Sequence, residues 1–524
     1  MKTTNCNSVA ENQLVSRQKA HDHGDDFEEP KIQLREIVVK KADSGSHTVN
    51  ASRHEEPLSP VACLTLESSL DSYILTIVGF KKEIDVKSFK TLLRNNLAKH
   101  QRFSSVVVKD KHNNLKWCLR ELVIEDHVIV PCLNLSTVEN PNFINEYTSS
   151  LVTAPPLDPR RPLWEVHVLN VSSADAAASL VFRIHHSLGD CVSMLSLILY
   201  STSKAAHPKA LPTIPQNKAS RSTGFLQIAY NVVLGLWLTF LSLLNYGATL
   251  LWKRDKTLWR EENREKIGPK RLAHITFSIE DICLVRKAIN GTLNDVIMGA
   301  LSAGLVRYMS RRGYDKNVSV PQKMATSNDQ NTRAEQRLPS NIRLRAMVAV
   351  NMRPFRMLKD LDENMQSPSK AMWGNKIAFW MFPLPMLLYG DPLQYCRVTA
   401  MVSRLKKLSF EAPLTYIIAK HMPTKLVAYV SSKLAASTTL GFSNVMGPVE
   451  EIQYGDNPVT HIIPTAHVNY ASIVIHFISY AGKGKLVALV SEELIPDPQQ
   501  LCQDCADALQ LMKRAACVTP VQSS

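Results

Sequence analysis

The stretch His185-His186-Ser187-Leu188-Gly189-Asp190 stands where one predicted element gives way to another. The apolar run before it, residues 178–184, predicts a buried β-strand, and residues 191–202 predict a helix. Because neighbouring side chains on a strand point to opposite faces, His185 and His186 are poorly placed to share a metal ion. We expect one histidine to face a cleft and the other to pack or hydrogen-bond inward, with no metal site.

A histidine at the end of a strand is suited to proton transfer. Its unperturbed pKa of about 6.5 allows it to take a proton from an alcohol near neutral pH. Asp190 is placed to order the turn, either by capping the following helix or by pairing with a cation such as Arg183. From spacing alone, a structural and a catalytic role for the histidine pair both remain open.

The composition is that of an ordinary globular protein of 524 residues, long enough for two or three domains. Its net charge of +14 indicates an acidic partner: nucleic acid, anionic lipid headgroups or a phosphorylated substrate. The basic residues are scattered and no nucleic-acid-binding motif appears, so nucleic acid is the weakest of the three. The ten cysteines give no disulfide framework, and the start MKTTNCNSVA lacks the apolar core of a signal peptide. A reducing cytosol fits best.

Short β and α patterns alternate along most of the chain and predict an α/β protein of mixed α+β character. We divide it into a disordered polar extension (1–54), an N-terminal half with the histidine stretch (55–215), a basic-flanked apolar segment and linker (216–270), and a C-terminal half (271–517). Further strands are expected at 73–78, 163–171, 273–278 and 344–351, a hairpin at 471–479 and 486–491, and helices at 85–99, 279–288, 293–311 and 497–514. We expect a surface loop at 321–340 and the lining of a pocket or tunnel at 372–389.

Residues 224–252 form the most unusual segment, because they are mostly apolar and contain no charged residue. About 20 apolar residues are enough for a helix to cross a bilayer, so membrane contact is favoured over a buried core helix. One crossing would separate two halves that must meet if they share an active site. We therefore expect a re-entrant hairpin or an interfacial helix, with Asn245-Tyr246-Gly247 as the candidate bend.

Further motifs accompany the histidine stretch. They are Pro162-Leu163-Trp164-Glu165-Val166-His167 before it, and Asn294-Asp295, Asn351-x-Arg353-Pro354, Gly374-Asn375 and Ser443-Asn444-Val445-Met446-Gly447-Pro448 after it. In this order, over about residues 55–517, they resemble the plant wax ester synthase/diacylglycerol acyltransferase family, the bifunctional WSD type. The HHxxxD pattern alone is shared by the wider chloramphenicol-acetyltransferase-like superfamily, and the later motifs with the apolar segment narrow the match. Taken locally, residues 443–448 predict a turn between two strands.

The resemblance implies two chloramphenicol-acetyltransferase-like halves with a tunnel between them and the histidine motif at its centre. It makes His186 the general base, Asp190 a residue of motif architecture and His185 a supporting residue. The candidates for substrate binding or for stabilising the oxyanion are Asn294, Asp295, Arg353, Asn375, Ser443 and Asn444. The family pattern ends in Asp-Gly, whereas this chain has Asp190-Cys191. The turn is strained if glycine's backbone freedom is needed there, but the first position of a helix accepts cysteine.

The implied reaction transfers an acyl group from acyl-CoA to a long-chain fatty alcohol and forms a wax ester, with diacylglycerol as a second acceptor that gives triacylglycerol. Acyl-CoA is a substrate, and no metal or organic cofactor is implied. The expected partners are these substrates and membrane lipids, not nucleic acid. The expected location is the endoplasmic reticulum membrane with both halves facing the cytosol, and the plasma membrane is an alternative.

Two other interpretations remain open. One is a soluble-type acyltransferase of the same superfamily acting on non-lipid alcohols or amines. Such enzymes typically carry a DFGWG-like segment, which this sequence lacks, and have little use for residues 224–252. The other is a catalytically inactive lipid-binding membrane protein, for which Cys191 is the only support in the sequence.

Overall fold

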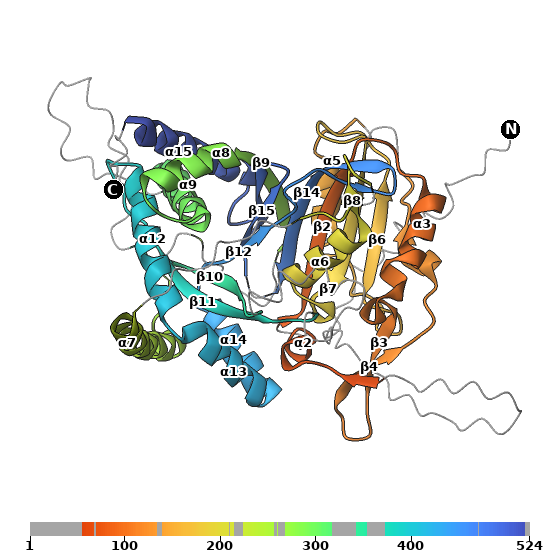
Figure 1. The fold of residues 1–524 in the computed structure, drawn as a ribbon, viewed down its shortest axis with the longest axis horizontal. Coiled ribbons are helices and arrows are strands. Elements are labelled where there is room, and N and C mark those ends of the chain that lie inside the picture. Colours follow the sequence, from red (N-terminus) through yellow and green to blue (C-terminus); the bar gives the residue numbers. More distant parts are fainter. Residues whose placement is uncertain are drawn as a thin grey trace, which may run out of the picture.

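The computed structural model describes residues 55–67, 70–133, 139–208, 210–213, 224–255, 259, 268–316, 342–353, 373–469 and 471–518. The predicted extension at 1–54 and the predicted loop at 321–340 lie outside these ranges. Two large sheets stand side by side with helices packed against them (Figure 1). This is the mixed α/β fold class that the sequence predicts.

The first sheet has seven strands in the order β5-β6-β7-β2-β14-β13-β8. They are β2 (Ser72–Phe80), β5 (Val128–Ile129), β6 (Trp164–Leu169), β7 (Ala178–His185), β8 (Ser203–Lys204), β13 (Ile452–Tyr454) and β14 (Asn457–Val468). Its helices are α3 (Val86–Asn95), α5 (Phe143–Ser150) and α6 (Cys191–Ser201). Asp85 caps α3 by accepting hydrogen bonds from the backbone N–H groups of Lys87 and Ser88.

The second sheet has six strands in the order β11-β10-β12-β15-β16-β9. They are β9 (Lys270–Ser278), β10 (Leu344–Asn351), β11 (Ile377–Leu384), β12 (Leu440–Met446), β15 (Ile473–Tyr480) and β16 (Lys483–Ser491). One face packs against α8 (Ile279–Ala288), α9 (Leu293–Lys316) and α15 (Pro498–Val518) in the largest hydrophobic core. The predicted strands and helices on described residues are present, with their ends moved by a few residues. Residues 377–384 form the edge strand β11, paired with β10, and the lining of a pocket or tunnel expected at 372–389 stays a prediction.

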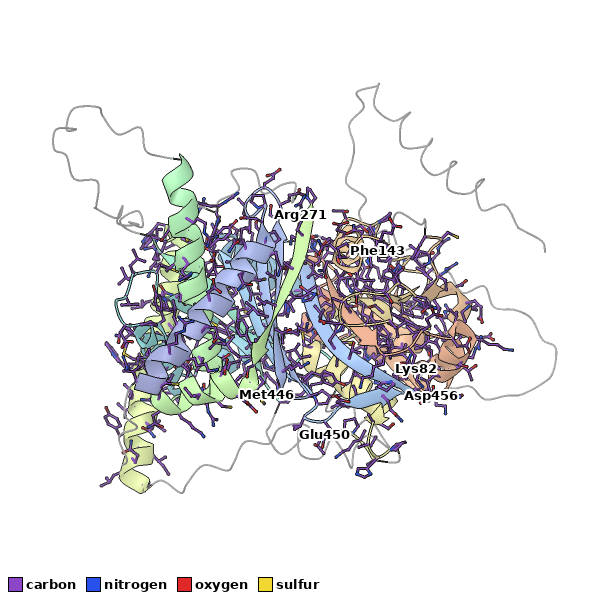
Figure 2. The ribbon with its side chains drawn as sticks, turned by 90° about the horizontal axis from the view of Figure 1, so that it is seen from above. Lys82, Phe143, Arg271, Met446, Glu450 and Asp456 are labelled. Atoms are coloured by element: carbon purple, nitrogen blue, oxygen red, sulfur yellow. The ribbon has the colours of Figure 1, made fainter. Side chains whose placement is uncertain are left out.

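The two sheets do not coincide with the two predicted halves of the chain. Both β13 and β14 come from the C-terminal half, yet they belong to the first sheet, where β14 pairs with β2 along its length. Met446 and Glu450 mark the segment by which the chain passes from one sheet to the other (Figure 2). The division at residue 271 is therefore wrong for 452–468, because their pairing partners lie in the N-terminal half.

A small third sheet and several short helices complete the N-terminal part. The sheet contains β1 (Glu55–Pro57), β3 (Ser105–Lys109) and β4 (Leu115–Leu119), in the order β1-β4-β3. The short helices are α2 (Pro60–Leu64) and the 3-10 turns η2 (Leu97–Lys99), η3 (Gln101–Ser104), η4 (Ile124–Asp126) and η5 (His186–Leu188). Every cysteine in the described part of the chain is a free thiol.

The apolar segment is one continuous helix, α7 (Phe225–Leu251), long and apolar enough to cross a membrane. It packs against α12 (Leu393–Leu408), α13 (Glu411–His421) and α14 (Thr424–Ala436), and Figure 1 shows these four helices together. The hairpin and the bend expected at 245–247 are wrong, because the helix runs through these residues. Contacts on its docked side hold it there: Tyr246 donates its hydroxyl to the carbonyl of Phe379 over 3.1 Å.

Candidate active site

The histidine stretch forms a tight turn between β7 and α6. His185 is the last residue of β7, His186 begins η5, and Cys191 is the first residue of α6. A Cβ atom on Gly189 would lie 2.9 Å from Cβ of Ser193, so the close approach of the turn to α6 requires glycine at this position. Cys191 stands at the first helical position, where a side chain is tolerated, and its backbone is not strained.

His185 is buried and held from two sides. Its Nδ1 accepts a hydrogen bond from the backbone N–H of Ser187 over 3.1 Å and lies 2.7 Å from the Ser187 hydroxyl. Its Nε2 is 2.9 Å from the Asp71 carboxylate. Because Nδ1 accepts, the proton sits on Nε2 and is donated to Asp71. His185 thus fixes the shape of the turn and keeps no free ring nitrogen.

His186 is held differently, and it retains partial exposure. Its Nδ1 lies 3.0 Å from Oδ1 of Asn375, while Nδ2 of Asn375 donates to the carbonyl oxygen of His186 over 2.8 Å. The second bond fixes the orientation of the amide, so the Asn375 oxygen must accept the Nδ1 proton. The neutral ring therefore carries its lone pair on Nε2. Burial lowers the pKa of His186 and the nearby Asp190 carboxylate opposes this, so the neutral ring is favoured at neutral pH.

Asp190 joins the turn to the second sheet. It caps α6 by accepting from the backbone N–H of Ser193 over 3.0 Å. Its carboxylate also accepts two parallel bonds from the guanidinium of Arg353, at 2.8 and 2.9 Å, and both side chains are almost fully buried. The predicted capping is present, but the cation is Arg353 and not Arg183, which pairs with Glu165 at 3.0 Å instead.

Residues 373–376, which lead into β11, contact the motif one after another. The indole N–H of Trp373 donates to the carbonyl of Leu188 over 2.7 Å, and the backbone N–H of Lys376 donates to Asp190 over 2.8 Å. Gly374, whose φ of +100° suits glycine, exchanges hydrogen bonds with the Ser193 hydroxyl. Together with Asn375, this segment holds the turn from the second half of the molecule.

Asn294 and Asp295 stand at the start of α9, and Asn444 of β12 reaches Asn294. Nδ2 of Asn444 donates to Oδ1 of Asn294 over 3.3 Å. Asp295 accepts from the backbone N–H of Thr292 and donates its own to the Thr292 hydroxyl, which is a reciprocal helix cap. Within the described residues, none of the three hydrogen-bonds to His186. Asp295 is therefore engaged in capping α9 through Thr292. The roles of Asp295 and Asn294 in substrate binding or in stabilising the oxyanion stay predictions.

Ser443 lies in the strand β12 and not in a turn, whereas residues 447–448 lie in the connection between β12 and β13, so the turn is predicted correctly only for its second part. It forms a side-chain hydrogen bond with Cys191, whose pKa burial raises to about 12. The thiol therefore stays protonated at neutral pH, on a half-buried residue. Ser443 also stands directly opposite His476 in the β12–β15 ladder. The structure thus brings Ser443, Arg353 and Asn375 to the motif, each from the second half.

Sequence reasoning missed Ser193, Trp373 and His476. Ser193 follows Asp190 by three residues, the spacing of a helix cap, so this contact had a local signal. His476 is the one histidine in the apolar strand 473–478, and a polar residue at a buried strand position is a signal of function. Nothing near Trp373 in the sequence indicates that its indole reaches Leu188, because the two residues are 185 positions apart.

Comparison with known proteins agrees with this geometry. Residues 142–297 match the wax ester synthase/diacylglycerol acyltransferase catalytic domain, and residues 373–513 match the WS/DGAT C-terminal domain. Wax ester synthase/diacylglycerol acyltransferase 5 of Arabidopsis thaliana is 35% identical over 508 residues, covering 92% of this chain and 96% of that protein. Wax ester synthase/diacylglycerol acyltransferase 4 of the same plant is 34% identical over 485 residues, covering 88% of this chain and 90% of that protein.

Solved structures share the fold at low sequence identity. The wax ester synthase/diacylglycerol acyltransferase from Marinobacter aquaeolei VT8 aligns with a TM-score of 0.55 at 16% identity, covering 88% of this chain and 100% of that chain. The first condensation domain of the calcium-dependent antibiotic synthetase aligns with a TM-score of 0.53 at 11% identity, covering 88% of this chain and 97% of that chain. The chain therefore belongs to the wax ester synthase/diacylglycerol acyltransferase family and is an acyltransferase.

Proposed function

We propose that the protein transfers a fatty acyl group from acyl-CoA to the hydroxyl of a long-chain alcohol, with Nε2 of His186 as the general base. One observation carries this proposal: Asn375 holds the Nδ1 proton of His186, which leaves the lone pair on Nε2. The depressed pKa of His186 keeps that nitrogen unprotonated at neutral pH. The membership of the family supports the same chemistry.

In this mechanism Nε2 removes the hydroxyl proton as the alcohol oxygen attacks the thioester carbonyl. The carbon–oxygen bond forms and the carbonyl electron pair moves to oxygen, giving a tetrahedral oxyanion. Collapse of the oxyanion breaks the carbon–sulfur bond, and the departing thiolate recovers the proton from His186. His185 and Asp190 hold the turn through Asp71 and Arg353 while His186 changes charge. No step needs an acyl-enzyme, a metal or an organic cofactor.

We propose long-chain fatty alcohol as the principal acceptor, giving wax esters, and diacylglycerol as a second acceptor, giving triacylglycerol. The names of the relatives join both activities, which supports keeping both acceptors. The tunnel that would hold the two chains stays a prediction.

The test compares ester formation by microsomes carrying the wild type, a His186→Ala variant and a His112→Ala control. His112 is exposed, so its loss should leave activity unchanged. We expect His186→Ala to lose ester formation by about 10²-fold or more, the range of general-base catalysis. Equal ester formation by wild type and His186→Ala would refute the mechanism. Expression in cells lacking neutral lipids, with and without fed fatty alcohol, identifies the acceptor: wax ester only with feeding, and no triacylglycerol, excludes diacylglycerol.

We also propose that α7 lies along the surface of a membrane without crossing it. Its docked side is attached between Gly235 and Thr249: these two residues and Thr239 are buried, and the Thr239 hydroxyl accepts the backbone N–H of Phe410 over 2.8 Å, whereas residues 225–230 are exposed. Its other side is apolar and exposed, with Phe225 at 82% and Leu251 at 72%. Because the attached side must stay on the body of the protein, only the exposed side is free to enter lipid.

The neighbouring helices α13 and α14 extend this apolar surface and add positive charge. Ile417, Met422 and Leu426 are exposed there, and Lys420 and Lys425 lie beside them. Apolar side chains ringed by lysines suit the boundary between acyl chains and anionic headgroups. We propose the cytosolic face of the endoplasmic reticulum as the location, with the plasma membrane as the alternative; the free cysteines fit a reducing compartment.

Protease treatment of sealed microsomes tests this arrangement. If α7 lies on the surface, protease digests both halves of the chain without detergent. A lumenal protein serves as the control for sealed vesicles. Protection of one half and digestion of the other would mean that α7 crosses the bilayer.

A further inference from the structure

Two neighbouring strands of the second sheet turn alternate side chains toward the first half. On β12 and β15, Leu440, Phe442, Ile473 and Ile475 belong to the core that packs against α9 and α15. The residues between them therefore point to the other face of the sheet. Val445 packs against α6 of the first half, and Ile478 belongs to the core of the first half. Ser443 and His476 share this face with them and so point toward the histidine motif.

His476, on the second sheet, is close enough to His186, in the turn after β7 of the first, for the charge of His186 to lower the pKa of His476. It is 3% exposed, and its Nδ1 has no hydrogen-bond partner within the described residues. A buried polar atom without a hydrogen-bond partner destabilises the folded protein. Because this atom faces the histidine motif from the other half, its missing partner indicates that a bound substrate completes the contact.

We propose that His476 donates a ring N–H to the thioester oxygen as it becomes the oxyanion. This inference rests on the proposed reaction at His186 and adds a second catalytic residue to it. His186 takes the alcohol proton from one side, and His476 meets the negative charge that develops on the carbonyl oxygen from the other. No proton is transferred from His476: it donates one hydrogen bond that strengthens as the charge forms and weakens when the thiolate leaves.

The charge state of His476 suits this role. Burial lowers its pKa to about 4, and His186 adds to the lowering, so the ring is neutral in the working pH range. A neutral ring does not repel the imidazolium that His186 becomes during the reaction. It still supplies one N–H donor, because neutral imidazole has one donor and one acceptor nitrogen. A donor fixed before the reaction needs no rearrangement as the oxyanion forms.

The test replaces His476 with phenylalanine, which has no donor, and with glutamine, which retains an N–H group. Purified enzyme in detergent is assayed with an acyl-CoA and a fatty alcohol, and rates are normalised to folded protein by thermal unfolding. We expect His476→Phe to lower kcat about 10²- to 10³-fold, as the loss of one oxyanion donor does elsewhere, with KM for both substrates changed little. The kcat of His476→Gln should be at least tenfold higher than that of His476→Phe.

His274→Phe is the matched control. His274 lies on β9 in the same cross-strand row, with Val487 between it and His476, and burial also lowers its pKa to about 4. The charges near it are Lys485, His461 and Asp175, not His186, so its replacement should leave kcat unchanged. A fall in kcat equal to that of His476→Phe would show that packing and not the donor matters, and would overturn the proposal.

Two further outcomes also overturn it. A rise in the KM for alcohol with kcat unchanged would place His476 in acceptor binding. Equal activity of the phenylalanine and glutamine variants would exclude a role for the N–H. The failure of the proposed function is distinguishable, because it would appear as full activity in His186→Ala, whereas the failure of this inference leaves His186 essential.

Discussion

A buried arginine stands near each end of strand β10, and each forms an ion pair with an aspartate from a different part of the chain. Arg353, just beyond the C-terminal end, pairs with Asp190 of the histidine motif. Arg345, near the N-terminal end, pairs with Asp255 at 2.5 Å, and both side chains are nearly buried. Each guanidinium also reaches backbone carbonyls: Arg353 reaches Gly374, and Arg345 reaches Lys253 and Ser437.

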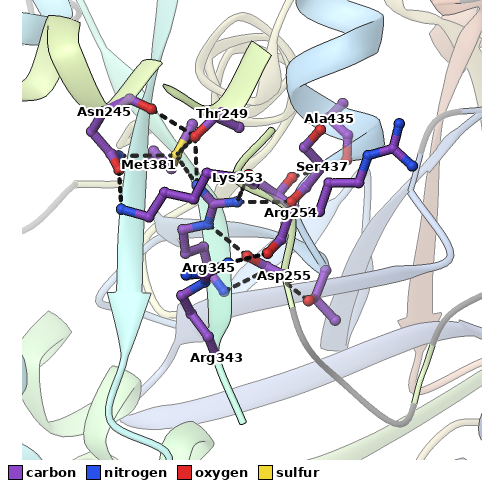
Figure 3. A network of polar contacts seen from close by, with 12 residues as sticks. Asn245, Thr249, Lys253, Arg254, Asp255, Arg343, Arg345, Met381, Ala435 and Ser437 are labelled. Atoms are coloured by element: carbon purple, nitrogen blue, oxygen red, sulfur yellow. Dashed lines mark hydrogen bonds and ion pairs between the residues drawn. The ribbon is translucent and has the colours of Figure 1, made fainter. Parts of the chain in front are cut away.

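The difference lies in what each arginine fastens. Figure 3 shows Arg345 among residues from the end of α7 and from the segment after it, including Thr249, Lys253 and Asp255. Arg353 instead fastens α6 and the turn that carries His186. One strand therefore joins α7 at one end and the histidine turn at the other. We expect both ends to contribute to stability, and only the Arg353 end to affect the proposed reaction at His186.

Asp190→Ala should have the largest effect. It leaves the Arg353 guanidinium buried without its partner, removes the cap of α6 and releases the turn. We expect a loss of about 3–5 kcal/mol in the free energy of unfolding, the range for breaking a buried ion pair, together with a loss of acyl transfer. Denaturant unfolding and an ester assay measure the two effects. Full activity in a folded Asp190→Ala protein would show that the turn does not depend on this pair.

Asp255→Ala should destabilise the protein by a similar amount, about 3–5 kcal/mol, because Arg345 loses its buried partner. The activity per folded molecule in detergent should remain, since His186 and Asn375 are untouched. Binding to anionic vesicles should weaken, because α7 is no longer held at its C-terminal end. Co-sedimentation with vesicles and the same ester assay test this, and the comparison fails if kcat falls as far as in Asp190→Ala.

Asn375→Leu should lower kcat by about 10²-fold with a smaller effect on stability. The leucine cannot accept the Nδ1 proton, so His186 is free to adopt the tautomer that lacks the lone pair on Nε2. Asn375→Asp retains an acceptor oxygen and should recover part of the activity. Steady-state kinetics of both variants check this, and equal losses would mean that the acceptor oxygen is unimportant.

The smallest effect concerns pH. The pKa of His186 is lowered by burial, so the wild-type kcat/KM should fall on the acid side only below the ordinary histidine value of 6.5. Its hydrogen bond to Asn375 raises the pKa, so Asn375→Leu should move the acid limb further down. Asp255→Ala should leave the limb in place. A wild-type limb above 6.5 would contradict the depressed pKa.

The local parts of this site were accessible from the sequence. The apolar run, the turn glycine and the helical pattern from 191 fix where His185 and His186 stand, and the alternation of side chains on a strand separates them. The partner of Asp190 was not accessible, because Arg353 is 163 residues away and Arg183 is the nearer cation. Asn375 was recognised only as part of a motif, since its bond to Nδ1 exists only in the folded chain.

The wrong predictions have related causes. Asn245, Tyr246 and Gly247 suggest a bend by residue type, yet a glycine inside a helix costs only about 1 kcal/mol, and the contacts of Tyr246 with Phe379 and Glu411 outweigh it. The membership of a strand in one sheet or another depends on its pairing partner. By its position in the sequence β14 is expected in the C-terminal half. In the fold it pairs with β2 of the N-terminal half, where Ile463 stands opposite Ile77.

That exchange of strands has a consequence for how the protein is made. A ribosome completes residues 55–215 long before it reaches β14, so the first sheet emerges without the strand that β2 needs on one side. The edge of β2 stays unpaired until residue 468 has left the exit tunnel, and an unpaired edge is open to association with other chains. The N-terminal half is thus not an autonomous folding unit. Its completion waits for nearly the whole chain.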